Sequence, residues 1–226
     1  MNGLTNSSDQ PHNFQERWSS YYKAVEGRSP RETLLKALAC FESSTSFDHG
    51  SSSHHHSAFG DASKFAVDLG CGDGRDTVEL LRQGWQVLAI DGQDEAIARL
   101  LNRPNIDQTL LDTRVETFEN LVLPENSVDL INASFCLPFC ESTAFSKVWA
   151  MIITALRPGG IFCGHLFGDR DSWATNPGTH HLTRSEVDDL LQPFSLEWFD
   201  EEDHPGKTAL GDDKHWHIFN IVARKR

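Results

Sequence analysis

The chain has 226 residues, enough for one α/β domain with a sizeable core, and its formal net charge is -13 with a pI of about 5.2. This acidity argues against nucleic acid as a partner, because surfaces that bind nucleic acid are basic. No apolar run approaches the roughly 18 residues that cross a membrane, and the polar N-terminal segment lacks the apolar centre of a secretory signal.

The cysteine content favours a reducing compartment. Five cysteines are an odd number in a chain too large to need disulfide staples, so we expect free thiols and a cytoplasmic protein. Cys136 and Cys140 form a pair in an apolar stretch. A zinc site needs about four ligands, so this pair is interpreted as core thiols, and no metal site is predicted.

The first part of the chain, residues 1–41, is predicted to form a helical cap or lid. Trp18, Tyr22 and Val25 recur at the spacing of one helix face, and Pro30 suits the first turn of a second helix. Most of this apolar stripe is expected to pack on the body of the protein. One aromatic side chain is expected to reach the functional site.

Residues 42–64 are rich in serine, glycine and histidine, a composition typical of a flexible loop. Three consecutive histidines, His54 to His56, could bind adventitious metal. No further fixed ligands accompany them, so they are interpreted as part of a solvated linker. The patterned domain is then residues 65–226.

Strand-like and helix-like segments alternate from Phe65 onward. Such alternation predicts a Rossmann-like α/β fold, with a doubly wound, seven-stranded, mostly parallel sheet covered on both faces. The last two strands have no helix between them and are expected to form an antiparallel hairpin. The predicted strands are 64–70, 85–91, 107–112, 127–135, 161–168, 195–203 and 214–225, and the predicted helices are 75–84, 94–102, 142–156 and 183–194.

A glycine-rich turn after the first strand indicates a ligand site. Gly70, Gly72 and Gly74 depart from the G-x-G-x-x-G spacing of a dinucleotide loop, because the third glycine comes one residue early. Asp68 places a carboxylate where it would repel a pyrophosphate but suit a cation. Asp91 ends the second strand, where a carboxylate can accept hydrogen bonds from ribose hydroxyls. The pattern indicates a nucleoside that carries a positive charge, and S-adenosylmethionine fits.

The same residues carry a family resemblance. The stretch VDLGCGDGRD resembles the first motif of class I S-adenosylmethionine-dependent methyltransferases. VLAIDGQDEAI is similar to their second motif, SVDLINASF to the fourth-strand motif, and LRPGGIFCGHLF to the segment that leads into the fifth strand. The resemblance runs from Phe65 to Arg226 in the family's order and spacing. Within the class, the sequence resembles small-molecule methyltransferases of the tellurite-resistance type.

The resemblance implies cofactor-binding residues by position. The glycine turn would hold the methionine part of S-adenosylmethionine, with its backbone amides meeting the carboxylate, and the end of the second strand would hold the ribose. Residues after the third strand would flank the adenine, and those leaving the fourth strand would face the acceptor. Ordinary loop capping is the alternative for the two aspartates, and a surface ion pair is the alternative for Arg114 with Glu116. The implied residues are Asp68, Gly70, Cys71, Gly72, Asp91, Gly92, Gln93, Arg114, Val115, Glu116, Asn132 and Ala133.

Residues that leave the fifth strand are candidates for contact with the acceptor. His165 and Asp169 are candidate catalytic residues, since either could take a proton or orient a polar acceptor. The alternative is that the carboxylate caps a helix and that the aromatic and histidine side chains are structural. The candidate substrate or lid residues are Trp18, Tyr22, Arg170, Trp173 and His217.

The predicted function is transfer of a methyl group from S-adenosylmethionine to a small-molecule acceptor by in-line displacement. Such transfer needs alignment and exclusion of water, and it needs a general base only when the acceptor arrives protonated. The fourth-strand exit, NASFCLPFC, lacks the Asn/Asp-Pro-Pro-aromatic pattern of enzymes that methylate DNA bases. We expect no nucleic-acid or membrane partner and a monomer or homodimer. The alternatives are an S-adenosylmethionine-binding protein without transfer activity and an NAD-dependent oxidoreductase.

Overall fold

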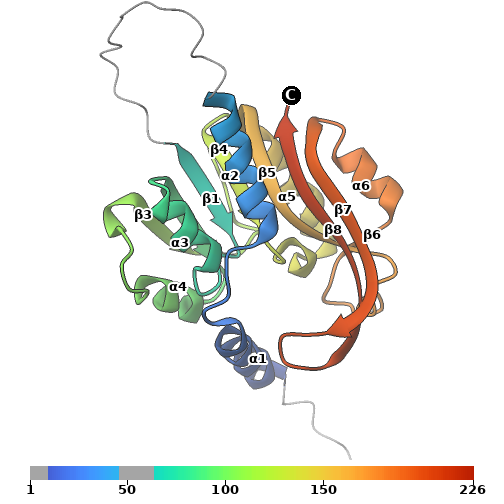
Figure 1. Ribbon diagram of the computed structural model, residues 1–226. Coiled ribbons are helices and arrows are strands. Elements are labelled where there is room, and N and C mark those ends of the chain that lie inside the picture. The colour runs from blue at the N-terminus through green and yellow to red at the C-terminus, as the bar shows by residue number, and fades with distance from the viewer. Residues whose placement is uncertain (1–9, 46–63) are drawn as a thin grey trace, which may run out of the picture.

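The computed structural model describes residues 10–45 and 64–226 (Figure 1). Its regular elements alternate along the body of the chain as their apolar patterns predict. The helices are α1 (Gln10–Val25), α2 (Glu32–Thr45), α3 (Arg75–Arg82), α4 (Asp94–Leu101), α5 (Ser142–Ala155) and α6 (Arg184–Leu190), with single 3-10 turns η1 (Gln108–Leu110) and η2 (Leu137–Phe139). The strands are β1 (Phe65–Leu69), β2 (Gln86–Asp91), β3 (Leu111–Val115), β4 (Val128–Ala133), β5 (Leu156–Gly168), β6 (His181–Leu182), β7 (Phe194–Lys207) and β8 (Asp213–Lys225).

The strands form one mixed sheet in the order β3-β2-β1-β4-β5-β8-β7, and the short strand β6 pairs with β5 outside this path. Strands β1 to β5 pair in parallel, whereas β8 is antiparallel to both β5 and β7. In the centre, Val67 pairs with Leu88 on one side and with Ile131 on the other. This arrangement confirms the predicted Rossmann-like sheet and its antiparallel C-terminal hairpin.

Helices cover both faces of the sheet because successive strand side chains point to opposite sides. On β1, Ala66 packs with Leu34 of α2 and Leu80 of α3, whereas Val67 belongs to the cluster that includes Ile152 of α5. Burying each large apolar side chain stabilises the fold by about 1.5–3 kcal/mol. None of the helices within the described residues is long and apolar enough to cross a bilayer.

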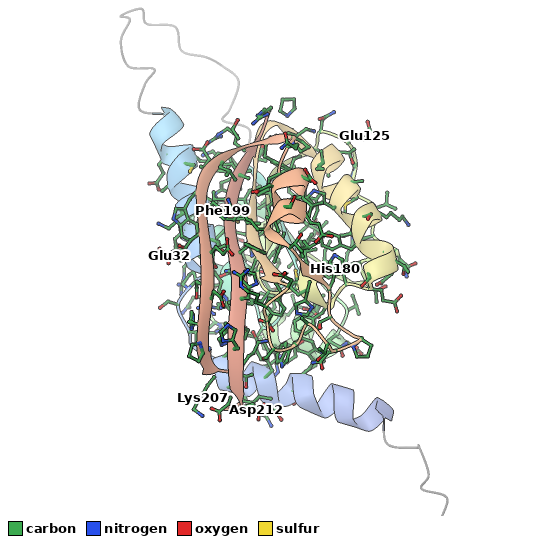
Figure 2. All side chains as sticks on the ribbon, turned by 90° about the vertical axis from the view of Figure 1, so that its right-hand side faces the viewer. Glu32, Glu125, His180, Phe199, Lys207 and Asp212 are labelled. Carbon is green, nitrogen blue, oxygen red and sulfur yellow. The ribbon has the colours of Figure 1, made fainter. Side chains whose placement is uncertain are left out.

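The carboxyl ends of the parallel strands open toward α1, which crosses beneath this edge of the sheet (Figure 1). The tip of the β7–β8 hairpin lies beside α1, as the labelled Lys207 and Asp212 show (Figure 2). The hydroxyl of Ser19 on α1 donates a hydrogen bond to Glu95 of α4 at 3.1 Å. Ligands of open α/β sheets bind outside the carboxyl ends of the strands, so α1 and the hairpin tip enclose the expected site.

Three details differ from the sequence-based expectation. The strand predicted at 107–112 lies at Leu111–Val115, because the Asp107 side chain accepts the N–H of Thr109 and begins a 3-10 turn first. Helix α2 continues to Thr45, past the predicted end of the cap. The short strand β6 has no counterpart in the prediction. Most of the predicted loop 42–64, with its histidine run, lies outside the described residues.

The cysteines are free thiols. Cys136 and Cys140, interpreted as core thiols, are buried, with exposed fractions of 9% and 2%. Both belong to the apolar cluster between the sheet and α5. Burial raises the pKa of the Cys140 thiol to about 11, so this thiol is protonated at neutral pH.

Candidate cofactor and acceptor site

The turn between β1 and α3 requires glycine because its backbone is left-handed and closely packed. Gly70, Gly72 and Gly74 have φ values of 62, 56 and 84, in a region that other residues rarely adopt. A Cβ atom at Gly70 would overlap the Cβ of Cys136, and one at Gly74 would overlap the side chain of Leu100. The close packing fixes the turn at the carboxyl end of β1.

Two buried carboxylates lie next to this turn. Asp68 and Asp76 are 1% and 4% exposed. The amide of Asn132 donates to both, at 2.8 Å to Asp68 and 3.1 Å to Asp76, and Thr77 donates to Asp68 at 2.5 Å. Burial, reinforced by the charge of Asp76, raises the pKa of Asp68 to about 7. Two carboxylates in this environment favour a positively charged ligand, because a nearby cation stabilises their ionised forms.

Asp91 links the glycine turn to the end of β2. Its two carboxylate oxygens accept the backbone N–H groups of Gly72 and Gln93, each at 2.9 Å. Each oxygen keeps a further lone pair, so the carboxylate can still accept hydrogen bonds from a ligand. The N–H of Glu116 donates to the Asp91 carbonyl at 2.9 Å, which brings the end of β3 to the same place. The remaining predicted residues along this edge are exposed: Gly92, Arg114 and Val115.

A small cavity of about 50 Å³ separates the turn from α1. It is lined by Asp68, Asp76 and the turn, and on the other side by Tyr21 and Tyr22 of α1. Tyr22 is only 3% exposed, and burial, with the charge of Asp91, raises its pKa. A nucleoside is larger than this cavity, which has room for only about one or two waters. A nucleoside bound at the turn would therefore extend beyond this cavity.

Arg75 brings an available hydrogen-bond donor to the small cavity. Its Nε donates to the Ser29 carbonyl, whereas Nη1 is buried and has no hydrogen-bond partner among the described residues. The backbone amides of the turn already have partners, because Cys71 donates to Ile90 and Gly74 donates to Cys71. An anionic group bound here would therefore meet the guanidinium more readily than these amides.

A larger cavity of about 420 Å³ adjoins the first, and Tyr21 and Arg31 line both. This volume falls in the range of sites for small organic ligands, about 300–1,000 Å³. Glu202 and His204 of β7 contribute polar groups and are joined at 2.9 Å. The aromatic side chains of its wall are Trp18, Tyr21, Phe135, Phe139, Phe167, Trp173 and Trp216.

The fold and the glycine turn agree with a comparison against protein families. Residues 67–164 match a family model described as a methyltransferase domain. Over this range, which is less than half of the chain, the sequence is similar to methyltransferase domains. The matched range begins in β1 and ends in β5, so it includes the glycine turn, both buried carboxylates and Asp91.

Two curated relatives are similar to part of this chain. Phosphoethanolamine N-methyltransferase 1 of Triticum aestivum is 30% identical over 115 residues, 48% of this chain. Methyltransferase ptaI of Pestalotiopsis fici is 32% identical over 134 residues, 55% of this chain. The matches span only 23% and 39% of the relatives' own lengths.

Solved structures share the fold. A 1,6-didemethyltoxoflavin-N1-methyltransferase from Burkholderia thailandensis, with bound S-adenosylhomocysteine, matches 100% of this chain and 93% of its own at 20% identity, with a TM-score of 0.58. TehB from Haemophilus influenzae has a TM-score of 0.63 at 17% identity, over 73% of this chain and 58% of its own. The likeness to TehB shows a shared fold.

The two candidate catalytic residues, His165 and Asp169, line neither cavity. His165 is 4% exposed and stacks on Phe135 with ring centroids 4.0 Å apart. Burial, together with the charge of Arg31, lowers its pKa well below the usual range, so the imidazole is neutral. The Asp169 side chain is 48% exposed, and its Oδ1 atom lies 3.4 Å from Nδ1 of His217. Their catalytic role stays a prediction, and His165 meets the large cavity only through Phe135.

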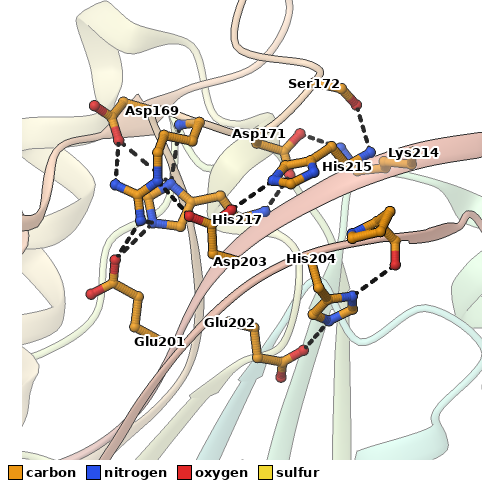
Figure 3. Close-up of polar contacts among 12 residues, drawn as sticks. Asp169, Asp171, Ser172, Glu201, Glu202, Asp203, His204, Lys214, His215 and His217 are labelled. Atoms are coloured by element: carbon orange, nitrogen blue, oxygen red, sulfur yellow. Dashed lines mark hydrogen bonds and ion pairs between the residues drawn. The ribbon is translucent and has the colours of Figure 1, made fainter.

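Arg170 and His217 belong to a polar cluster on the β7–β8 hairpin (Figure 3). The buried His217 ring accepts the backbone N–H of Arg170 at 3.0 Å and contacts Glu201 at 3.0 Å through its other nitrogen. The Arg170 guanidinium pairs with Glu201 and Asp203. Neither residue lines either of the two cavities described above, and their contacts join β7, β8 and the segment after β5. By contrast, the predicted residues Trp18 and Trp173 line the larger cavity, and Tyr22 lines the smaller one.

Several residues that line the cavities were not predicted from the sequence. Phe135 and Phe139 lie in NASFCLPFC, which indicated only that a known motif was missing. Alternation along β8 places Trp216 on the face opposite His215 and His217, but alternation alone does not say which face meets the ligand. Asp76 was predicted only as part of a helix, although a residue that closely follows a glycine turn is a candidate for contact with a ligand. Other residues of the larger cavity that were not predicted include Arg28, Arg31, Glu202 and Lys207.

Proposed function

We propose that this chain transfers a methyl group from S-adenosylmethionine to a small molecule held in the larger cavity. The supporting observation is the junction of two unlike cavities, one lined by buried carboxylates and the other by aromatic rings, at Tyr21 and Arg31. S-adenosylmethionine supplies a methyl group on a positively charged sulfur, and transfer breaks that carbon–sulfur bond as a bond to the acceptor forms, leaving S-adenosylhomocysteine.

The residues of the small cavity fit this cofactor. Asp68 and Asp76 offer negative charge for the ammonium and sulfonium groups, and the free Nη1 of Arg75 offers a donor for the carboxylate. Asp91 keeps lone pairs for the ribose hydroxyls. The exposed edge at Gly92 and residues 114–116 leaves room for the adenine.

The residues of the large cavity would align the acceptor and exclude water. Phe135 sits between His165 and the cavity, with the Arg31 guanidinium 4.4 Å from its ring centroid. Stacked on both sides, this ring forms a rigid wall at the junction. Trp18 of α1 packs on Phe139 with centroids 5.5 Å apart, so closure of α1 completes the wall around the acceptor.

Replacement of Asp91 by alanine is the direct test of the cofactor site. We expect S-adenosylmethionine to bind about 10- to 100-fold more weakly, because hydrogen bonds to a charged group contribute about 1.5–3 kcal/mol. The measurement is calorimetric titration, with Asp112→Ala, an exposed aspartate on β3, as the matched control. If the wild-type protein binds no S-adenosylmethionine, the proposed function is wrong.

Cofactor binding should also depend on pH through Asp68. Its pKa of about 7 lies above the usual value, so the carboxylate loses its proton as the pH rises through 7. A cationic ligand prefers the ionised form, and affinity for S-adenosylmethionine is therefore expected to rise about tenfold from pH 6 to pH 8. Calorimetric titrations at both values check this result. The Asp68→Asn variant should show a flat profile, and a wild-type profile that is equally flat would contradict the prediction.

A further inference from the structure

The larger cavity carries positive charge in a strongly acidic chain. The whole sequence has 33 acidic and 20 basic residues, yet the cavity wall has one carboxylate, Glu202. That carboxylate already has two partners, since it contacts His204 at 2.9 Å and accepts from Asn220 at 2.8 Å. A hydrogen bond to the Pro205 carbonyl, and then Glu202, raise the pKa of His204, which favours its cationic form. The cationic groups of the wall are Arg28, Arg31, His204 and Lys207.

Two of these cations have no carboxylate partner. Arg28 and Arg31 lie in the turn between α1 and α2, and neither guanidinium forms an ion pair within the part of the chain that the structure describes. Lys207 differs, because it pairs with Asp213 at 2.7 Å. With 13 more acidic than basic residues in the chain, this pair of unneutralised guanidiniums beside a cavity indicates a site for an anion.

The aromatic wall also disfavours a cationic guest. Lys214 is fully buried and lines neither cavity, but its ammonium lies 3.8 Å from the ring centroid of Trp173 and 4.4 Å from that of Trp216. Phe167 is 5.3 Å away. A cation already interacts with these rings, so the rings attract a second cation less strongly than free aromatic faces would.

We propose that the methyl acceptor is a small aromatic acid. Its ring would lie against Phe135, Trp173 and Trp216, and its oxyanion would be held by Arg28, with Arg31 at the junction adding positive charge. Arginine suits this role because its planar fork binds a carboxylate through two parallel hydrogen bonds. The volume of about 420 Å³ limits the guest to a compound of one or two rings. This inference rests on the proposed function, since it names the substrate class of the same site.

The test begins with S-adenosylhomocysteine alone. Wild type, Arg28→Gln and the control Arg82→Gln should bind it equally, because Arg82 lies on α3 and Arg28 lines only the larger cavity. Failure of the wild type to bind S-adenosylhomocysteine would remove the proposed function itself. If all three proteins bind S-adenosylhomocysteine equally, acceptor binding can then be measured separately on the proteins saturated with S-adenosylhomocysteine.

The loaded proteins are then titrated by tryptophan fluorescence with matched probes. These are benzoate, 4-hydroxybenzoate and 2-naphthoate, the arylalkylamines benzylamine and tyramine, uncharged phenol, and phosphoethanolamine, which has no ring and carries a phosphate and an ammonium group with a net negative charge. We expect carboxylates to bind about tenfold tighter than the amines and phenol, and Arg28→Gln to weaken carboxylate binding about tenfold. Arg82→Gln should leave carboxylate binding unchanged.

Four results would overturn the aromatic-acid assignment. One is equal or tighter binding of the amines, and another is preference for phosphoethanolamine over every aromatic acid. The third is no carboxylate binding at millimolar concentration by a protein that binds S-adenosylhomocysteine. An equal loss of phenol and carboxylate binding in Arg28→Gln would also contradict it, because a charge contact should not affect the uncharged ring.

Discussion

Replacing Lys214 with methionine is expected to lower the free energy of unfolding by about 3–5 kcal/mol. The ammonium hydrogen-bonds to Asp171, and both side chains are 0% exposed. Asp171 also accepts the N–H of Trp173 at 2.9 Å and that of His217 at 3.2 Å. Although burial opposes ionisation, the neighbouring His181 and Lys214 lower the pKa of Asp171 to about 2. Loss of the lysine would leave an ionised carboxylate buried without its cation.

A matched control lies on the same hairpin. Lys207 pairs with Asp213 at 2.7 Å, but these side chains are 66% and 91% exposed, so Lys207→Met should cost about 1 kcal/mol or less. The double variant Lys214→Met with Asp171→Asn should recover part of the loss, because no buried charge remains and the amide oxygen can still accept one of the two backbone N–H groups. Denaturant unfolding measures all three. The explanation fails if Lys214→Met is no more harmful than Lys207→Met.

The same lysine links stability to the acceptor cavity. Its ammonium lies against Trp173 and Trp216, which line the cavity, so Lys214→Met should also loosen that wall. Calorimetry can separate the two effects, because the proposed site for S-adenosylhomocysteine is the other cavity. We expect its affinity to stay unchanged in Lys214→Met under conditions where the variant is folded.

The clustering of the proposed cofactor residues could be predicted because these residues follow the strands in sequence. Asp68, the glycines and Asp91 each stand at the end of a strand, and parallel strands bring their ends to one edge of the sheet. Asn132, at the end of β4, reaches Asp68 by the same rule. The local sequence pattern and the sheet topology were therefore sufficient to predict that these residues lie together at one edge of the sheet.

The acceptor half depends on contacts between distant segments, which local pattern does not reveal. Arg31 and Phe135 are separated by about a hundred residues, yet the guanidinium lies on the ring. Lys214 and Trp216 lie in a strand whose two faces look alike in sequence, because each carries polar and aromatic side chains. The sequence correctly placed His165 on β5. Its burial beneath Phe135 could not be predicted, because that burial depends on how the two rings stack.

Replacing Gly70 with alanine is expected to destabilise the protein and to weaken cofactor binding at least tenfold. The left-handed backbone, with φ of 62, costs a non-glycine residue about 1–2 kcal/mol. The new Cβ would also overlap the Cβ of Cys136, and such overpacking typically costs about 1–3 kcal/mol more. Relief of the overlap would displace the turn from Asp91, and the cofactor site would lose its shape.

Gly84 provides the control that separates the two costs. It has a similar φ of 76, but no atom lies within 4 Å of a Cβ added there, so Gly84→Ala should carry the backbone cost alone. Cys136→Gly removes the opposing Cβ, and the double variant with Gly70→Ala should be less unstable than the sum of the two single changes. Denaturant unfolding gives this coupling, and titration with S-adenosylmethionine reports the turn. Additive effects would show that the overlap does not control the turn, and equal costs at Gly70 and Gly84 would lead to the same conclusion.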